Sequence, residues 1–474
     1  MQVLDEHQFK LILGLKIQEE RKNSELSLQE LAQQTGLSKS YLNEIEKGKK
    51  YPKPDKLQLI AHALDVEFEY LAAPKLEGKL EAVYNLITSP VLQSVPLDFF
   101  GIQPGAVADL IAKAPDRVRA LFRTVLDLGQ HYNISRERLY FAVLQSYQEM
   151  HWNYFPKLEA WSEQQLLWMG RGVQLKDVEQ RLQERGLTVQ YEWPEAFHEF
   201  GDLRSLLGPQ GRLYIREELS DPQKIFILLK ELYYLEHGVE SRPRTFPWIT
   251  FETFDEVLHN FEAGYAAGAV LLPKLQLAKT LNELLVHPTN GDLQLLLQWI
   301  AAHPTGTETL LQRMTNILPG MLGMKHLFFL RLTAGVHLPK ITKQLHLLQQ
   351  WNAYEIKSNE HYCARWLSMK LLSGEDGAQV QLSQYPDGAE YLVIGAPKRS
   401  NNQESIALGL LLDRGTKRKL HVEWDRIEKV KVGHTCERCP IADCQERLAP
   451  SDLLEESQRE ERLKKALHLF GKGA

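Results

Sequence analysis

A run of polar and basic side chains lies between residues 38 and 56. It contains six lysines against three acidic residues, although the whole chain has a net charge of -5. Hydroxyl, amide and ammonium groups can hydrogen-bond to the edges of DNA bases, and lysines beyond them can neutralise phosphates. The first group comprises Ser38, Lys39, Ser40, Tyr41 and Asn43, and the second comprises Lys47, Lys49, Lys50 and Lys53. This local composition favours contact with DNA.

Two short helices joined by a tight turn would position these side chains. Ser27 is a helix N-cap with Glu30 in capping-box spacing, and Gly36 ends the helix that follows. Ser38 caps the next helix, whose inward apolar side chains are Leu42 and Ile45. Such a pair is a helix-turn-helix, in which the second helix enters the major groove by its N-terminal residues.

Apolar periodicity predicts further helices on both sides of this pair, at residues 9–20 and 57–71. The run SLQELAQQTGLSKSYLNEIEKGKKYPKPDKLQLIAHAL resembles the phage-repressor-like (XRE) helix-turn-helix family. The resemblance implies a lambda-repressor-like bundle that binds double-stranded DNA, in which Gln29 contacts a phosphate of the DNA backbone. It also implies that bases or backbone are contacted by Lys39, Ser40, Tyr41 and Asn43. The alternative is a small helical bundle used only for protein contacts.

Length and composition limit what the rest of the chain can be. A chain of 474 residues is too long for one core, so several domains are expected. Its 43% hydrophobic and 25% charged residues are those of an ordinary soluble protein, and no apolar run reaches the roughly 20 residues of a membrane span. The N-terminus, MQVLDEHQFK, lacks the basic-then-apolar order of a secretion signal. We therefore expect a cytoplasmic protein without a membrane segment.

A short strand and a helix are predicted within residues 211–238, GRLYIREELSDPQKIFILLKELYYLEHG. The helix begins near the caps Ser220 and Asp221, with Pro222 in its first turn. This stretch resembles the core of the ImmA/IrrE-type zinc metallopeptidase domain, whose helix carries the motif H-E-x-x-H. The resemblance implies a zincin-like α+β domain in the middle of the chain.

The residues that zinc hydrolysis requires are missing from this helix. Two histidines one turn apart hold the metal, and the adjacent glutamate acts as general base. Here Lys230 and Tyr234 stand at the histidine positions, while Glu231 stands at the glutamate position. Glu262, in FEAGYAAGAVLLPK, matches the family's third ligand, but one carboxylate cannot hold zinc. We therefore expect a degenerate peptidase domain without a catalytic residue, and a protein that is not an enzyme.

Three of the four cysteines form a C-x2-C-x4-C run, made of Cys436, Cys439 and Cys444, with His434 two residues before it. Close thiols in a cytosolic chain indicate metal binding more than a disulfide. A closed zinc site usually takes four ligands in two pairs, and an iron–sulfur cluster with an outside ligand is a second option. The third is a cysteine-rich turn whose thiols pack and remain reduced. Metal binding at this run is the one cofactor that the sequence suggests.

The C-terminal half predicts an α+β domain. The alternating runs QVQLSQY and EYLVIGA, joined by Pro386, Asp387 and Gly388, predict a hairpin, and residues 453–470 predict a surface or dimer-contact helix. WNAYE, QLSQYPDGAEYLVIGAPKR and CERCPIADCQERLAP each look like segments of the short-chain fatty acyl (acyl-CoA) regulators. That resemblance implies an acyl-CoA or a related metabolite as effector.

Together these features predict a mainly α, multidomain chain in four parts. They are a helix-turn-helix domain (1–75), a helical region (76–190), a degenerate ImmA/IrrE-like domain (191–290) and a C-terminal α+β sensor or dimerisation domain with the cysteine run (291–474). We predict a homodimeric, sequence-specific DNA-binding transcriptional regulator that responds to a metabolite. The alternatives are a metallopeptidase that cleaves a repressor partner and a ligand-independent DNA-binding scaffold.

Overall fold

The computed structural model describes most of the chain in segments. They are residues 6–73, 136–170, 172–201, 203–239, 251–287, 293–335, 338–346, 359–399, 403–422, 424 and 427–470. Contacts divide the chain into two units, residues 1–143 with 250–257 and residues 144–249 with 258–474. Much of the predicted helical region, residues 76–135, lies outside the described residues.

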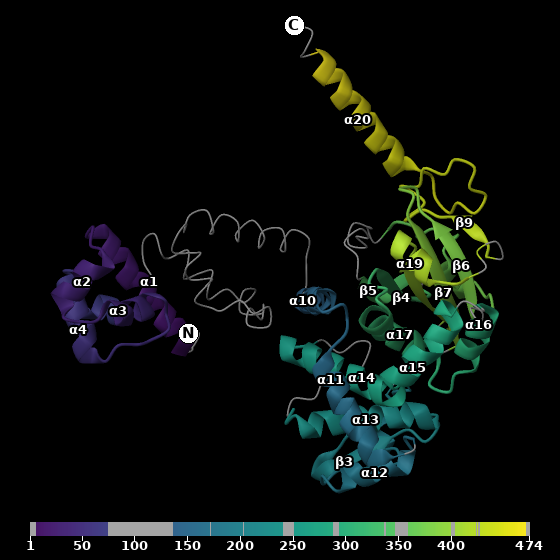
Figure 1. Ribbon diagram of the computed structural model, residues 1–474, viewed down its shortest axis with the longest axis horizontal. Helices are drawn as coiled ribbons and strands as arrows, with labels where there is room; N and C mark the ends of the chain where they lie inside the picture. The colour runs from purple at the N-terminus through teal and green to yellow at the C-terminus, as the bar shows by residue number, and fades with distance from the viewer. Residues whose placement is uncertain are drawn as a thin grey trace. The chain divides into compact units, whose positions relative to one another are not determined.

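Five helices of the described residues form the N-terminal head (Figure 1). They are α1 (Glu6–Asn23), α2 (Leu28–Thr35), α3 (Lys39–Glu46), α4 (Pro54–Ala63) and α5 (Phe68–Ala72). Their apolar faces meet in one core, which includes Leu13, Ile17, Leu31, Leu42, Ile45, Leu57, Ile60 and Leu71. The predicted helix-turn-helix bundle is confirmed, and the inward positions Leu42 and Ile45 are fully buried.

Helix α1 is fixed to both α3 and the end of α5. A Cβ added at Gly14 would lie 2.4 Å from the carbonyl oxygen of Ile45, so the two helices touch backbone to backbone. Lys16 is buried, and its ammonium donates to the carbonyl oxygens of Tyr70 and Ala73, the latter at 2.8 Å. A cation at the carbonyl end of a helix is favourable because it satisfies the last acceptors. The buried Lys16 therefore joins the first helix of the head, α1, to the end of its last helix, α5.

Helices and a small sheet form the first part of the second unit. The helices are α11 (Pro156–Met169), α12 (Leu175–Gln183), α13 (Asp221–Glu236) and two that span the boundary between units, α10 (Arg136–Met150) and α14 (Phe254–Leu271). In the sheet, β3 (Arg212–Ile215) lies between β1 (Thr188–Gln190), which is parallel to it, and the antiparallel β2 (Ser205–Leu207). Short 3-10 turns occur at Glu195–Phe197 and Pro209–Gly211. The strand and helix predicted within residues 211–238 are both present.

Helices α13 and α14 share a core with α11 and α12. The backbone N–H of Ser220 donates to Gln223 Oε1 at 3.1 Å, which fixes the start of α13. Helix α14 buries Ala263, Ala266 and Ala267 completely, and such small side chains allow close packing of helices. This core contains side chains from both sides of residue 190, the position at which the sequence predicts the boundary between the helical region and the peptidase-like domain.

A six-stranded sheet with helices on both faces forms the rest of the second unit. The strands are β4 (Leu327–Thr333), β5 (Lys340–His346), β6 (Gln379–Gln384), β7 (Glu390–Arg399), β8 (Gln403–Leu411) and β9 (Lys429–Lys431). Their order is β5-β4-β8-β7-β6-β9, with β9 parallel to β6 and the other pairs antiparallel. The predicted β6–β7 hairpin is confirmed, and Gly388 takes the left-handed φ of 88° that its turn requires.

Six helices of the described residues accompany this sheet. They are α15 (Lys274–Leu281), continued by a π-helical turn (Asn282–Val286), α16 (Leu293–Ala302), α17 (Thr307–Leu322), α18 (Leu367–Leu372), α19 (Arg414–Lys419) and α20 (Asp452–Phe470). Helices α15 to α17 pack on one face of the sheet, where Leu327 and Phe329 join their core (Figure 1). Helix α18 packs on the other face, against Leu330 and Leu332. Alternate residues of β4 thus face opposite layers, as the pleat of a strand requires.

A buried ion pair joins the two parts of the second unit. Arg313 on α17 contacts both carboxylate oxygens of Glu159 on α11, at 2.6 and 2.9 Å, and each side chain is only 2% exposed. The Tyr265 hydroxyl on α14 donates to the same carboxylate at 2.6 Å. Because a buried charge without a partner is very costly, this contact fixes α17 against α11 and α14.

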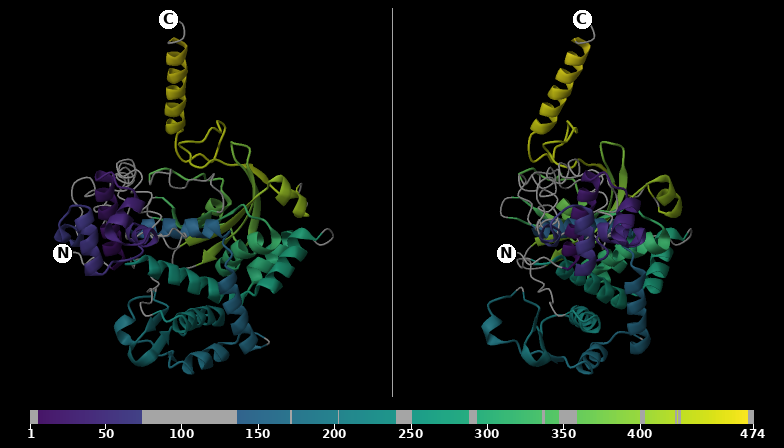
Figure 2. Two further views of the ribbon diagram at one scale, coloured as in Figure 1. Left: turned by 60° about the vertical axis from the view of Figure 1, so that its left-hand side comes forward. Right: turned by 90° about the vertical axis from the view of Figure 1, so that its left-hand side faces the viewer.

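Helix α20 extends away from the sheet in every view (Figures 1 and 2). Its side chains are mostly exposed, among them Leu463 and Leu467. The helix predicted at residues 453–470 is therefore present, and its predicted role in dimer contact stays a prediction. Among the helices of the described residues, none is long and apolar enough to cross a membrane.

Candidate nucleic-acid interface

The start of α2 and the turn that leads from it into α3 are built from local interactions. The Ser27 hydroxyl accepts from the Glu30 N–H at 3.2 Å, while Glu30 accepts from the Ser27 N–H at 2.7 Å. Gly36 takes a φ of 69°, which permits the chain to reverse without strain, and the Ser38 hydroxyl then accepts from the Tyr41 N–H at 3.2 Å. Short-range sequence signals therefore set the position at which α3 begins.

The acidic side chain at the end of α3 is turned inward. Glu46 is buried and accepts two hydrogen bonds from Arg21 of α1, at 2.7 and 2.9 Å. The hydrogen bond to Glu46 raises the pKa of Arg21 further, although burial opposes its charge. This pairing removes one of the three carboxylates of the 38–56 run from the surface. The exposed side of α3 therefore carries fewer acidic side chains than the sequence of the helix contains.

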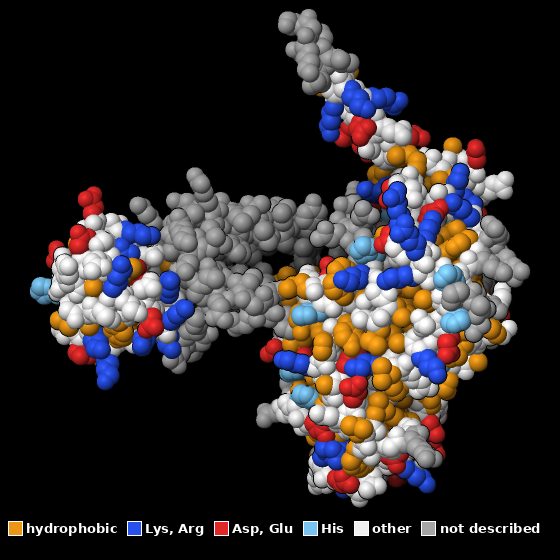
Figure 3. Space-filling model, viewed as in Figure 1, with side chains coloured by type: hydrophobic (Ala, Val, Ile, Leu, Met, Phe, Trp, Pro, Cys, Tyr) orange, Lys and Arg blue, Asp and Glu red, His pale blue; other side chains and the backbone are white. Residues whose placement is uncertain are grey.

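Most of the predicted contact residues lie on the surface of the head. Exposed members are Gln29, Ser38, Lys39, Ser40, Lys49, Lys50 and Lys53, and half-buried members are Tyr41, Asn43 and Lys47. They belong to the first turns of α2 and α3 and to the segment that follows α3, which share one structural unit. Figure 3 shows several Lys and Arg side chains on the visible face of the head. The residues are thus available to a ligand, and their individual roles stay predictions.

Tyr41 is held between two lysines. The ammonium of Lys56 lies 4.7 Å from the centre of its ring, and that of Lys50 lies 5.4 Å away. Lys50 also pairs with Glu44 at 3.1 Å. Cation–π contacts of this kind order long side chains at a surface. The sequence identifies Lys56 as basic but not as a neighbour of Tyr41, because the contact crosses the turn that contains Pro52 and Pro54.

The degenerate peptidase positions lie on α13 and α14. The Lys230 ammonium donates to Asn260 Oδ1 on α14 at 2.8 Å, and the Tyr234 ring is buried. Glu262 accepts from the Tyr233 hydroxyl at 3.1 Å, and burial raises its pKa. An ammonium and a phenol thus occupy the two positions that the resemblance assigns to the imidazole ligands of a zinc peptidase. The likeness to that domain remains a prediction. The sequence contains no sign that Asn260 is the partner of Lys230, because the two residues lie on different helices.

A fourth cysteine, Cys363, lies beside the residues that precede the cysteine run. Cys436 and Cys439 are buried and Cys444 is partly exposed. Cys363 donates its N–H to the His434 carbonyl at 3.1 Å, and its Sγ accepts from the Gly433 N–H at 3.3 Å. Burial raises the pKa of Cys363 to about 11. Within the described segments, no three His, Cys, Asp or Glu side chains are grouped to hold a metal, and the metal site remains a prediction.

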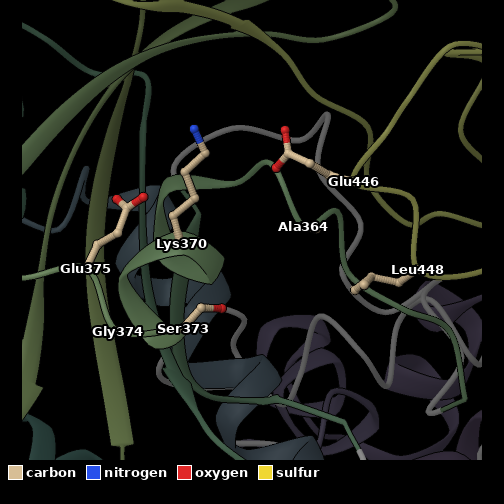
Figure 4. Close-up of a pocket in the computed structure, with 7 residues that line it drawn as sticks. All are labelled: Ala364, Lys370, Ser373, Gly374, Glu375, Glu446 and Leu448. Carbon is tan, nitrogen blue, oxygen red and sulfur yellow. The ribbon is translucent and has the colours of Figure 1, made fainter.

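An open pocket of about 520 Å³ lies beside α18 (Figure 4). Its lining residues are Ala364, Lys370, Ser373, Gly374, Glu375, Glu446 and Leu448. Figure 4 shows the charged ends of Lys370 and Glu446 on different sides of the opening. Two carboxylates against one ammonium make this pocket unfavourable for an anionic ligand.

Comparison with protein families identifies two regions of the chain. Residues 17–71 match the helix-turn-helix family, and residues 341–466 match the family described as short-chain fatty acyl coenzyme A regulator, C-terminal. The first match covers α2 and α3, and the second includes the β6–β7 hairpin and the cysteine run. No curated protein matches the chain.

Solved structures add two distant similarities. One is a transcriptional regulator of Mycobacterium tuberculosis, with a TM-score of 0.49 and 19% identity over 65% of this chain and 92% of that chain. The other is the apo form of the competence regulator ComR from Streptococcus vestibularis, with a TM-score of 0.14 and 16% identity over 64% and 90%. Because both TM-scores are below 0.5, conclusions about function rest on the family matches and not on these structures.

Proposed function

We propose that this chain, a DNA-binding transcriptional regulator, changes its operator binding when a short-chain acyl-CoA occupies its second unit. The observation that carries the proposal is that one chain contains both a helix-turn-helix match and a match to acyl-CoA regulators. A DNA-binding head explains contact with an operator but not control of that contact. The acyl-CoA regulator match supplies the class of effector.

The polar start of α3 would read the operator. Asn43 and Lys39 carry the amide and ammonium groups that pair with adenine and guanine edges in the major groove. Gln29 at the start of α2 would hold a phosphate, because helix N-termini favour anions. Further phosphates would be neutralised by Lys47, Lys49, Lys50 and Lys53, a contact that fixes position and not sequence.

The regulator would act as a homodimer in the cytoplasm. Helix α3 has eight residues, of which the first turn reaches base edges, so one head reads only a few base pairs. Two heads on adjacent half-sites double the contacts, which is how helix-turn-helix proteins gain specificity. The exposed leucines of α20 offer one surface for such pairing.

The second unit would sense a ligand and would not catalyse a reaction. Lys230 and Tyr234 supply no metal ligand at the positions where a zinc peptidase binds its metal, so Glu231 has no metal-bound water to activate. The metallopeptidase alternative requires bound metal and proteolysis that is lost in Glu231→Gln. Purified protein that cleaves no partner, with the same result for Glu231→Gln, would exclude it.

Footprinting with the full chain tests the proposal. DNA from the neighbourhood of the gene would be probed with the protein alone, and then with acetyl-CoA, propionyl-CoA or butyryl-CoA. We expect a protected site whose occupancy changes with an acyl-CoA but not with the matching free acid. A protected site that no acyl-CoA alters would overturn ligand control and support the scaffold. Absence of any protected site would overturn the proposal that the protein binds an operator in this DNA.

A further inference from the structure

One carboxylate lies on the outward face of α3. Successive residues of a helix are rotated by about 100°, so Ser40 and Glu44, one turn apart, point away from the side that carries Leu42 and Ile45. Leu42 and Ile45 are buried in the core of the head, whereas the Glu44 side chain is 43% exposed. Glu46, the other acidic residue of α3, is buried. The surface predicted to face DNA therefore contains a carboxylate that is not among the contact residues predicted from the sequence.

Glu44 is paired with a lysine from the segment that follows α3. Gly48 takes a φ of 66°, and the Lys49 N–H donates to the Glu44 carbonyl oxygen at 2.9 Å, so the chain turns back at the end of the helix. The Lys50 ammonium donates to Glu44 Oε2 at 3.1 Å and lies 5.4 Å from the centre of the Tyr41 ring. Lys50 therefore links the carboxylate to this ring and limits the positions that the carboxylate can take.

A carboxylate in the major groove would distinguish the bases by charge. DNA phosphates repel it, and so do the acceptor atoms on base edges, which are O6 and N7 of guanine, O4 of thymine and N7 of adenine. Cytosine presents its N4 amino group in this groove, which can donate to a carboxylate oxygen. A carboxylate offers about four acceptor positions, so Glu44 can accept from a base while it stays paired with Lys50. Such a pair would favour cytosine, and the lysine would reduce the repulsion by phosphates.

We propose that Glu44 determines specificity by accepting a hydrogen bond from the N4 amino group of one cytosine in the operator. Lys50 is a positioning residue that holds the carboxylate for this contact. An exposed ion pair contributes little to folding stability, and α3 is already fixed by the core of the head, so the pair is not needed to hold the helix. The inference rests on DNA binding by the head and is independent of the effector.

Selection of DNA from a random-sequence pool by the full chain, followed by sequencing of the bound fraction, tests this role without knowledge of the operator. The wild type should enrich a motif in which one position is cytosine. In Glu44→Ala, the preference at that position should fall about 10- to 100-fold, as for loss of one base contact. In Glu44→Gln, the preference should move towards adenine, because an amide pairs with N6 and N7 of that base. Preferences at the other positions should be retained.

Matched variants separate base reading from a change of charge or fold. Glu69→Gln removes the same charge from an exposed residue of α5 and should retain the motif. Lys50→Gln should weaken the cytosine preference about threefold at the same position, as for loss of an exposed ion pair. Lys49→Gln removes a neighbouring exposed lysine and should leave that preference unchanged. Circular dichroism should show the same helical content in all variants.

The outcomes separate this role from the proposed function. A motif that is identical in the wild type, Glu44→Ala and Glu44→Gln would overturn the assignment, even if both variants bind all DNA more tightly, because Glu44 would then only repel phosphates. If the wild type enriches no motif, both this contact and operator recognition are wrong. Because the selection contains no acyl-CoA, failure of the proposed effector leaves the result for Glu44 unaffected.

Discussion

Lysines gather in two regions of this molecule, and their surroundings differ. On the head, Lys39, Lys49 and Lys53 are exposed at the ends of short elements. In the second unit, Lys230 and Lys343 are half-buried, and each is held by an amide from a neighbouring helix. Exposed lysines suit a long polyanion that approaches from outside, because they adjust to it at little cost. Lys230 and Lys343 already donate to side chains of the protein itself, so they are less free to adjust to a partner.

The same difference appears in what holds each region together. The head depends on helix caps and a small apolar core, so its contact residues are positioned locally. The second-unit lysines depend on α13, α14, α17 and β5 meeting correctly, and the buried pair of Arg313 and Glu159 fixes one of these helices. Damage to that pair should therefore destabilise the second unit and spare the head.

Replacing Glu159 should produce the largest effect. Glu159→Ala leaves the buried guanidinium of Arg313 without a carboxylate, which we expect to lower the free energy of unfolding of the second unit by about 3–5 kcal/mol. All nine tryptophans lie at or after Trp152, so tryptophan fluorescence in a urea titration reports this unit alone. Operator binding by the head should persist at low denaturant.

A second glutamate on α11 provides the control. Glu163 pairs with Lys274 at 3.0 Å on the surface, so Glu163→Ala should change the unfolding free energy by less than about 1 kcal/mol. Equal destabilisation by the two changes would show that burial of the Arg313–Glu159 pair is unimportant. Loss of operator binding in Glu159→Ala would show that the head is not independent of the second unit.

Changing the start of α3 should have the next largest effect. Lys39→Ala with Asn43→Ala removes two predicted base contacts, and we expect operator affinity to fall about a hundredfold. Neither side chain belongs to the core of the head, so its helical signal should be unchanged. Gln58→Ala with His62→Ala alters two exposed residues of α4 and serves as the control. Sequence-specific binding that survives in the first variant would move the reading surface away from α3.

The lysines that follow α3 should have the smallest effect. Lys49→Ala or Lys53→Ala removes one phosphate contact, and we expect about a threefold loss for every DNA sequence. The dependence of affinity on salt should become shallower by about one unit of log–log slope. Fluorescence anisotropy at several salt concentrations measures both quantities. A loss confined to the operator would mean that the lysine reads bases.

The sequence predicted the head well because its signals are local. Ser27, Glu30, Gly36 and Ser38 act within a few residues of their positions, and each has its expected role in the structure. The β6–β7 hairpin is predictable for the same reason, since its turn lies between the two strands. Where structure depends on neighbours close in sequence, cap and turn chemistry is sufficient.

The second-unit lysines could not be predicted in this way. Lys230 and Lys343 are more than a hundred residues apart, and Glu159 and Arg313 are separated by 154 positions. Periodicity assigns each side chain to a face of its own helix or strand but does not say which faces meet. The peptidase resemblance drew attention to Lys230 as a lost metal ligand, whereas in the structure its ammonium donates to Asn260 of the neighbouring helix α14.

The buried lysine of the head has a mechanical consequence. Lys16 ties the last carbonyls of α5, at Tyr70 and Ala73, to α1, and Gly14 of the same helix rests directly on the backbone of Ile45 in α3. A force on the chain beyond Ala73 would therefore be transmitted to α3, the predicted reading helix, through these two contacts in series. Removing the hydrogen bonds of Lys16, for instance by Lys16→Met, would weaken the coupling of α5 to α1 while leaving the predicted DNA-contact surface unaltered.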